Sequence, residues 1–259
     1  MIRLIEGEAF PSSLKSDPFG CRFWAAWNAY RGYGALCSSA FRLWEQEGSG
    51  LYLGLVDDAL LLFPSGKTAS GQEEWEEIVS FLPMTGAGKV LCPAFCGKRL
   101  GLPEEFRGRI LRREGTAAGK AKGAFPGGEE GAPDLRAVYR LLSFCRSENF
   151  HPPAFEPFYL DLSHRIRHRA AFLSTVYREG EPAAAAIAPA VTEEAALLSG
   201  VAVHPGFRRR GLGTEAVNKL VEELAVGSFW VFRAEGENKG FYTSLGFREE
   251  GDFLQLSLS

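Results

Sequence analysis

Residues 197–214 read LLSGVAVHPGFRRRGLGT, and this stretch decides the fold. An apolar strand is predicted to end at Val203, and Pro205 then stops its hydrogen-bond ladder because proline has no N–H group. A basic turn that contains glycines leads directly into a predicted amphipathic helix over residues 212–225. The first N–H groups of a helix have no partners within the helix and carry the positive end of its dipole. The turn is therefore a predicted cradle for a phosphate or pyrophosphate.

A basic turn alone fits equally well a solvated loop ahead of a capped helix, but a second pattern follows it. Residues 238–247 read NKGFYTSLGF. Together, the pattern Val-x-Val-x-Pro-x-x-Arg with Arg-x-x-Gly-x-Gly, and then Asn, an aromatic-Tyr pair and Gly-Phe, resemble the two acyl-CoA signatures of the GNAT family of N-acyltransferases. The resemblance covers about residues 134–259 and is sharpest at residues 199–214 and 238–247.

The resemblance implies where the cofactor would bind. The peptide groups of Val201, Ala202 and Val203 would hydrogen-bond the pantetheine arm as an added strand would. The amides that would hold the pyrophosphate belong to Arg208, Arg209, Arg210, Gly211, Leu212, Gly213 and Thr214. Asn238 would contact the cofactor from the second helix.

Tyr242 lies one helical turn after Asn238 on the same face, and the resemblance implies that it protonates the departing thiolate. The competing interpretation is a core aromatic beside Phe241 and Phe247. One of the adjacent rings 241 and 242 is expected to point away from the core, and the family pattern assigns this position to Tyr242.

The implied reaction is acetyl transfer from acetyl-CoA, the cosubstrate, to a primary amine, with no metal. The amine attacks the thioester directly in a ternary complex, and a backbone amide near Val203 polarises the carbonyl. No base is implied by the family pattern: Glu193 and Glu194 lie at the far end of the motif strand, His204 is expected to be exposed, and a water chain is an equal alternative. The acceptor, a small molecule or a peptide, is not determined by the motifs. A different class of function, a non-catalytic acyl-CoA-binding regulatory module, remains the alternative.

The element pattern predicts an α+β fold with a mixed central sheet flanked by helices. After a helix capped by Asp134, strands are predicted over residues 170–177, 183–189 and 195–203, then the helix, a strand at 229–232, a short helix at 238–245 and a strand at 253–258. The first half has predicted strands at 38–44, 51–56, 59–63 and 89–94 and a helix at 72–82, but no cofactor motif. This order resembles tandem GNAT proteins with a degenerate first copy; an unrelated α/β module is the alternative.

The boundary between the halves is predicted from composition. Residues 115–133 contain six glycines and two prolines and few branched apolar residues, which is typical of a linker or a long surface loop. The predicted domains are therefore residues 1–114, without a cofactor site, and residues 134–259, with one.

Composition narrows the class of protein. The 259 residues are 46% hydrophobic and 24% charged with a net charge of −3, which excludes wholesale disorder and argues against a nucleic-acid partner. No apolar run is long enough for a membrane span, and the N-terminus with Arg3, Glu6 and Glu8 is unlike a signal peptide. Five scattered cysteines are expected to be reduced thiols, so we expect a cytoplasmic monomer or homodimer.

Four further patterns are interpreted as structural. Residues 65–68, SGKT, lack the first glycine of a phosphate loop. His164 and His168 stand among arginines that would repel a cation, so a solvated basic turn is expected. Cys92 and Cys96 fit neither a zinc knuckle nor a redox pair and are expected to be buried thiols. An aromatic cluster is expected to be helix core, with a pocket lining as the alternative; it comprises Phe23, Trp24, Trp27, Tyr30 and Tyr33.

Overall fold

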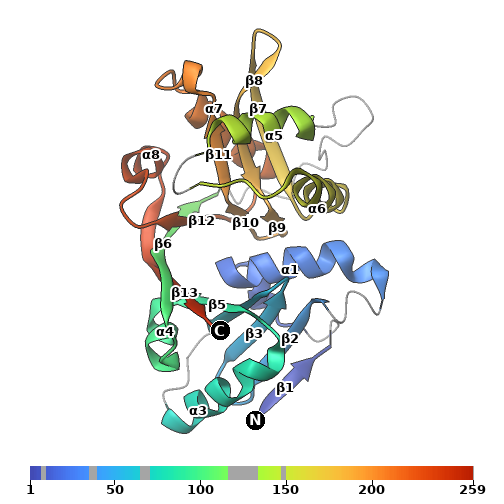
Figure 1. Cartoon of the computed structure of the whole chain (residues 1–259), viewed down its shortest axis with the longest axis vertical. Coiled ribbons are helices and arrows are strands. Elements are labelled where there is room, and N and C mark those ends of the chain that lie inside the picture. The colour runs from blue at the N-terminus through green and yellow to red at the C-terminus, as the bar shows by residue number, and fades with distance from the viewer. Residues whose placement is uncertain (7–9, 35–39, 65–70, 116–133, 147–149, 259) are drawn as a thin grey trace.

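The computed structural model describes residues 1–6, 10–34, 40–64, 71–115, 134–146 and 150–258 (Figure 1). The strands of these residues form a ten-stranded sheet and a three-stranded sheet, both packed against helices. The large sheet is mixed and the small one is antiparallel, so the predicted α+β fold with a mixed sheet flanked by helices is confirmed. Within the described ranges, no helix is both long enough and apolar enough to cross a membrane.

The two halves share the same order of elements. Each ends in three strands, a helix, a strand, a helix and a strand, and in the second half the second and the third of these strands are each split in two, into β8 and β9 and into β10 and β11. The elements of the first half are β1 (Ile2–Ile5), α1 (Pro18–Tyr30), β2 (Arg42–Gln46), β3 (Leu51–Val56), β4 (Ala59–Pro64), α3 (Gln72–Phe81), β5 (Lys89–Pro93), α4 (Ala94–Leu100) and β6 (Glu104–Glu114). Those of the second half are α5 (Leu135–Phe144), α6 (Phe155–Arg167), β7 (Phe172–Arg178), β8 (Glu181–Ala188), β9 (Ala190–Val191), β10 (Ala195–Leu198), β11 (Gly200–Val203), α7 (Leu212–Leu224), β12 (Ser228–Ala234), α8 (Lys239–Ser244) and β13 (Arg248–Ser257).

The halves exchange their last strands. The order in the large sheet is β1-β2-β3-β4-β5-β13-β6-β12-β10-β9, so β13 pairs with β5 of the first half and β6 pairs with β12 of the second. In Figure 1, β6 and β13 run side by side along the junction between the two halves. Arg109 of β6 fixes this junction by bonding Asp252 (2.6 Å) and Glu235 (3.0 Å) of the second half. Neither half therefore completes its sheet with its own strands.

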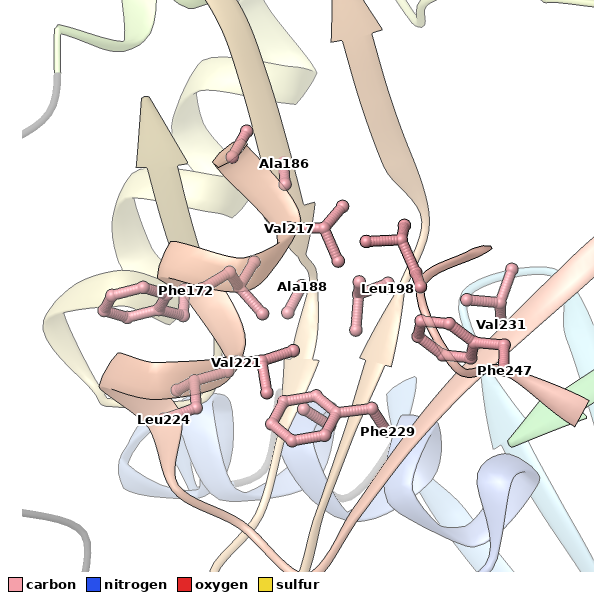
Figure 2. Packing of buried hydrophobic residues seen from close by; sticks show 14 of the residues in the cluster. Phe172, Ala186, Ala188, Leu198, Val217, Val221, Leu224, Phe229, Val231 and Phe247 are labelled. Atoms are coloured by element: carbon pink, nitrogen blue, oxygen red, sulfur yellow. The ribbon is translucent and has the colours of Figure 1, made fainter. Parts of the chain in front are cut away.

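The amphipathic helix α7 builds the main core of the second half. Its apolar residues recur every three or four positions and face the strands, as Figure 2 shows for Val217, Val221 and Leu224. Each fully buried Val or Leu side chain contributes about 1.5–3 kcal/mol to stability. The surrounding residues labelled in Figure 2 come from four strands and the segment after α8, and they are Phe172, Ala186, Ala188, Leu198, Phe229, Val231 and Phe247.

Helix α1 joins the halves through two faces. Asp17 caps it by accepting the N–H groups of Phe19 (2.8 Å) and Gly20 (2.9 Å). One face packs Phe23 into the core of the first half, and small residues such as Cys21 pack against β9 and β10 of the second half. The predicted aromatic cluster is only partly core: Phe23 is buried, but Tyr33 is 57% exposed.

Helix α6 was not predicted, and it corrects the expected solvated basic turn. His164 and Arg165 are buried against α1, and His164 Nε2 donates to the Ala29 carbonyl (2.8 Å). Asp161 accepts both the Arg165 Nε–H (2.8 Å) and the Tyr30 hydroxyl (2.8 Å). His164 and Asp161 therefore join the two halves, whereas His168 and its flanking arginines are exposed, so the prediction of a solvated basic turn fails only at His164 and Arg165.

The remaining patterns have the following outcomes. Cys92 and Cys96 are buried free thiols, as predicted, and Cys21 and Cys145 are also unpaired. The predicted helix at 72–82 and the strands at 51–56, 59–63 and 89–94 correspond to α3, β3, β4 and β5. Residues 65–68 and most of the predicted linker, 116–133, lie outside the described residues.

Candidate active site

The predicted strand 195–203 is split at Ser199 between two sheets. β10 pairs in parallel with β12 from Ala195↔Ser228 to Leu198↔Val231, whereas β11 pairs with β8 in the three-stranded sheet. The whole of β12 pairs with β6 on its other side, and the pairing with β10 ends at Val231, before the last residues 232–234. β11 and residues 232–234 diverge from each other, and we call the region between them the strand divergence. In Figure 1, β11 and β12 run in different directions, and α8 lies near the end of β12.

The peptide groups of β11 alternate between β8 and the strand divergence. His204 donates its N–H to the Ala183 carbonyl (2.9 Å), which makes this a hydrogen-bonded pair. In an antiparallel ladder such pairs alternate with non-bonded ones. The peptide groups of Ala202 therefore point to β8, and those of Val201 and Val203 point away from it. This polar edge is what an extended ligand requires for strand-like pairing.

The basic turn lies between β11 and α7. Arg209 (φ 63°) and Gly211 (φ 76°) are left-handed, and Gly211 occupies the N-cap of α7. The N–H groups of Leu212, Gly213 and Thr214 follow in the first helical turn, where they have no acceptor within the helix. These N–H groups point outward from the N-terminus of α7, which is the positive end of the helix dipole and the most favourable place for an anion to bind.

The three arginines of the turn are exposed, and none forms a salt bridge with another described residue. Arg208 Nε donates to the Val203 carbonyl (3.3 Å), and the Arg210 guanidinium lies 5.5 Å from the centre of the Phe207 ring. Their charges are therefore not neutralised by carboxylates, and the turn keeps a positive potential.

Gly213 is where α7, β11 and α8 approach each other most tightly. A Cβ atom at this position would lie 3.2 Å from Val203 Cγ2 and 3.4 Å from the Phe241 ring. Gly211, by contrast, has open space around it, and its requirement is the positive φ. The two glycines thus serve different needs: close packing at Gly213 and backbone conformation at Gly211.

Asn238 and Tyr242 lie on α8, beside the end of β12. Asn238 is the exposed, left-handed N-cap (φ 49°), a conformation that asparagine tolerates, and its side chain makes no capping bond. Its carbonyl accepts the Tyr242 N–H (3.2 Å), which sets the two residues one turn apart. Phe241 and Tyr242 both pack against the core of the second half, together with Val201 and Val203. Both rings are only half-buried, so the assignment of Tyr242 to the site stays a prediction.

The half-buried Tyr242 phenol has an unusually high pKa. Burial raises it to about 12, and the positive charge of Arg233 opposes this shift in part. The hydroxyl is therefore fully protonated at neutral pH and is a hydrogen-bond donor. Complete proton transfer to a thiolate with a pKa of about 8.5 would be uphill by about 5 kcal/mol.

Arg233 is a site residue that the sequence did not indicate. It is 5% exposed, and it bonds the Glu237 carbonyl (2.8 Å) and the Glu249 carboxylate (3.1 Å). These contacts fix the turn that carries Asn238. The sequence feature that could have indicated Arg233 is its position directly after the predicted apolar strand at residues 229–232.

The candidate bases lie in different places. Glu193 is bonded to Lys15 (3.2 Å) in the turn before β10, at the end opposite to the strand divergence, and Glu194 is its exposed neighbour. His204 follows β11 directly, but its Nδ1 accepts the Gly206 N–H (3.2 Å) and its ring contacts Phe144. No cluster of metal-ligating side chains occurs among the described residues.

The comparisons with known proteins agree with this geometry. Residues 135–247 match the model of the acetyltransferase (GNAT) family. A comparison with curated protein sequences gives no match.

Solved structures resemble the whole chain and not only its second half. A GCN5-related N-acetyltransferase from Kribbella flavida has a TM-score of 0.55 and 17% identity, covering 89% of this chain and 95% of its own. A tandem GNAT protein from the clavulanic acid biosynthesis pathway has a TM-score of 0.54 and 15% identity, covering 100% and 98%. A Drosophila protein has a TM-score of 0.64 and 13% identity, covering 99% and 98%. At these identities the likeness establishes the fold: two GNAT-like halves in tandem. Residues 135–247 of this chain are a domain of the acetyltransferase (GNAT) family.

Proposed function

We propose that the protein is a cytoplasmic N-acetyltransferase that transfers the acetyl group of acetyl-CoA to a primary amine. The observation that carries the proposal is the strand divergence, which has the basic turn at one end and Tyr242 beside it. Val201 and Val203 would pair with the pantetheine arm, and the amides of residues 208–214 would hold the pyrophosphate. Ala202 would support the strand from its buried side.

The reaction would be direct attack of a neutral amine on the thioester carbonyl. The C–N bond forms as the C–S bond breaks, the amine loses a proton to water or to a base, and the thiolate leaves as CoA. Tyr242 would donate a hydrogen bond to the leaving sulfur, because its high pKa favours donation over complete proton transfer. Asn238 would contact the cofactor from the same helix.

The first half would bind no CoA and would form part of the acceptor site. Its strands β4 and β5 end in Pro64 and Pro93, and no counterpart of residues 208–214 is present in the described part of this half. Support for its role comes from α1, which packs against β9 and β10 of the second half.

A non-catalytic acyl-CoA-binding module is the second candidate, and the high pKa of Tyr242 favours it because a weak acid gives limited help to a leaving group. The deciding experiment incubates the full chain with acetyl-CoA and panels of polyamines, aminoglycosides, amino acids and peptides, and measures the release of free thiol. Amine-dependent release, lost on replacing Gly211 by Val, supports the transferase. Tight CoA binding without any amine-dependent release supports the binding module.

A further inference from the structure

A cleft lies at the place in the first half that corresponds to the strand divergence, and Trp230 and residues 250–252 of the second half contribute to its lining. β4 and β5 pair in parallel from Ala59↔Lys89 to Leu61↔Leu91, and both strands then continue unpaired with each other, to Pro64 and Pro93. As in the second half, a short helix follows the second strand. The cleft here has a volume of 480 Å³ and is bordered by both prolines and by the start of α1.

The cleft is acidic. Its described lining residues include the acidic Asp17, Glu250 and Asp252. None of the described lining residues is Lys, Arg or His. Asp252 is neutralised by Arg109 (2.6 Å), but Asp17 is bonded only through backbone N–H groups, and Glu250 has no ion pair with a described residue. Two negative charges thus have no cationic partner among the described residues. The charge is opposite to that of residues 208–210, so a pyrophosphate would be repelled.

The rest of the lining is apolar and partly aromatic. Phe95 is 51% exposed, and Phe19, Ile110 and Trp230 complete the surface. The Trp230 ring already makes a cation–π contact, because the Arg112 guanidinium lies 5.2 Å from its centre. Arg112 also pairs with Glu114 (3.1 Å). Aromatic faces next to unpaired carboxylates suit an ammonium group with a hydrocarbon body.

We propose that this cleft binds an aliphatic ammonium compound, whose charge contacts the carboxylates of Asp17 and Glu250 and whose carbon chain lies against Phe95 and Trp230. The proposal is independent of the transferase activity. It assigns the first half a ligand of its own in place of CoA.

The raised pKa of Asp17 supports the proposal that the cleft binds a cation. Burial raises the pKa of this carboxyl to about 6, and no basic group lowers it. The thiols of Cys21 and Cys96 also lie near it, but burial raises their pKa values as well, so they stay neutral around pH 6. A bound ammonium ion favours the ionised carboxylate, so binding must weaken as the pH falls through 6.

The test is calorimetric titration of the full chain with 1,5-diaminopentane and with the uncharged 1,5-pentanediol at pH 7.5. We expect one saturable site for the diamine and no heat of binding for the diol. Asp17→Asn retains a good N-cap residue, and Glu250→Gln removes an exposed, unpaired charge, so both variants should fold. Each should weaken diamine binding about tenfold, the loss typical of a charge-assisted contact, as should Phe95→Ala for the carbon chain. Glu223→Gln, on the exposed side of α7, is the matched control and should bind normally.

Each contrary result overturns the proposal. These are no saturable diamine binding, equal binding of the diol, or undiminished binding by Asp17→Asn and Glu250→Gln. Competition by CoA would show that the diamine occupies the strand divergence, and a second CoA per chain would assign the cleft to CoA. An absence of acetyl transfer, in contrast, would refute the proposed function and leave the cleft's ligand unaffected.

Discussion

Arg208 donates its Nε–H to the carbonyl of Val203 across 3.3 Å, so a side chain of the basic turn occupies a peptide group of the neighbouring strand. Val203 is also one of the two residues whose peptide groups face the strand divergence. A pantetheine arm that paired with β11 would compete for this carbonyl. Arg208 would then be released to face the phosphates.

Competition between Arg208 and the pantetheine arm for the Val203 carbonyl can be tested by mutation. Arg208→Ala removes a phosphate contact and leaves the Val203 carbonyl with the Cys145 thiol (3.3 Å) as its one side-chain donor among the described residues. CoA binding should therefore weaken about three- to tenfold, while pantetheine, which has no pyrophosphate, binds no worse. Calorimetry with the two ligands measures the difference, and Arg140→Ala on α5 is the control. Equal weakening for both ligands would show that Arg208 serves the strand and not the phosphates.

Replacing Gly211 or Gly213 by Val should reduce CoA affinity for two different reasons. At Gly211 the positive φ costs a β-branched residue of order 1–3 kcal/mol and distorts the cradle. At Gly213 the new side chain meets Val203 and Phe241 and separates α7 from α8, so thermal stability should fall as well. Gly240→Val, with open space around it, is the comparison. Unchanged CoA affinity in both variants contradicts the pyrophosphate assignment.

Tyr242→Phe keeps the ring and its packing and removes only the donor. We expect kcat to fall about tenfold, at the low end for acid assistance, with CoA affinity nearly constant. Because the pKa of the phenol is raised to about 12, the wild-type rate should show no loss from Tyr242 ionisation up to about pH 10. The measurement is a pH–rate profile where chemistry is limiting; an unchanged kcat would restore the core-aromatic interpretation of Tyr242.

The stoichiometry of CoA should be one per chain. The described part of the first half has no arginine-rich turn like residues 208–210, and the carboxylates that line its cleft would oppose pyrophosphate binding. Equilibrium titration of the full chain gives the number directly. Two equivalent sites, or one that survives Gly211→Val and Gly213→Val, would contradict this division of roles.

Asp17→Asn should stabilise the protein at neutral pH. The pKa of this carboxyl is raised from 3.8 to about 6, so the folded state holds the proton more tightly than the unfolded state. The cost of its charge is therefore present above pH 6 and absent below about pH 4. We expect a gain of order 1–3 kcal/mol in the free energy of unfolding at pH 7.5 that disappears by pH 4. Denaturant unfolding at both pH values checks it, and a gain independent of pH would point to the cap instead.

The sequence predicted the elements whose local pattern carries the information. The helix over 212–225 has a continuous apolar face, and the strands 51–56 and 59–63 are almost wholly apolar, so each was found at its place. β6 was missed because its sequence, EEFRGRILRRE, is mostly charged. The partners of Arg109 at its centre, Asp252 and Glu235, are more than a hundred residues away along the chain. No local window contains that information.

The candidate site was predictable to the level of motifs and not of geometry. The order of the two patterns placed the basic turn and Tyr242 on the right elements. The division of the motif strand at Ser199 depends on which sheet each part joins, and the burial of Tyr242 depends on distant core residues. Both are properties of tertiary packing.

The exchange of β6 and β13 also bears on how the chain is made. β5 pairs with β4 on one side, but its other edge is covered only by β13, which is synthesised after every other described strand and helix. While the ribosome is still translating the second half, the emerged first half presents β5 as an unpaired edge, and such edges nucleate aggregation. A ribosome that stalls before residue 248 would release a chain with a sheet still open at its centre. Loss of β13 would thus open the sheet of the first half, although β13 follows all the other described elements of the second.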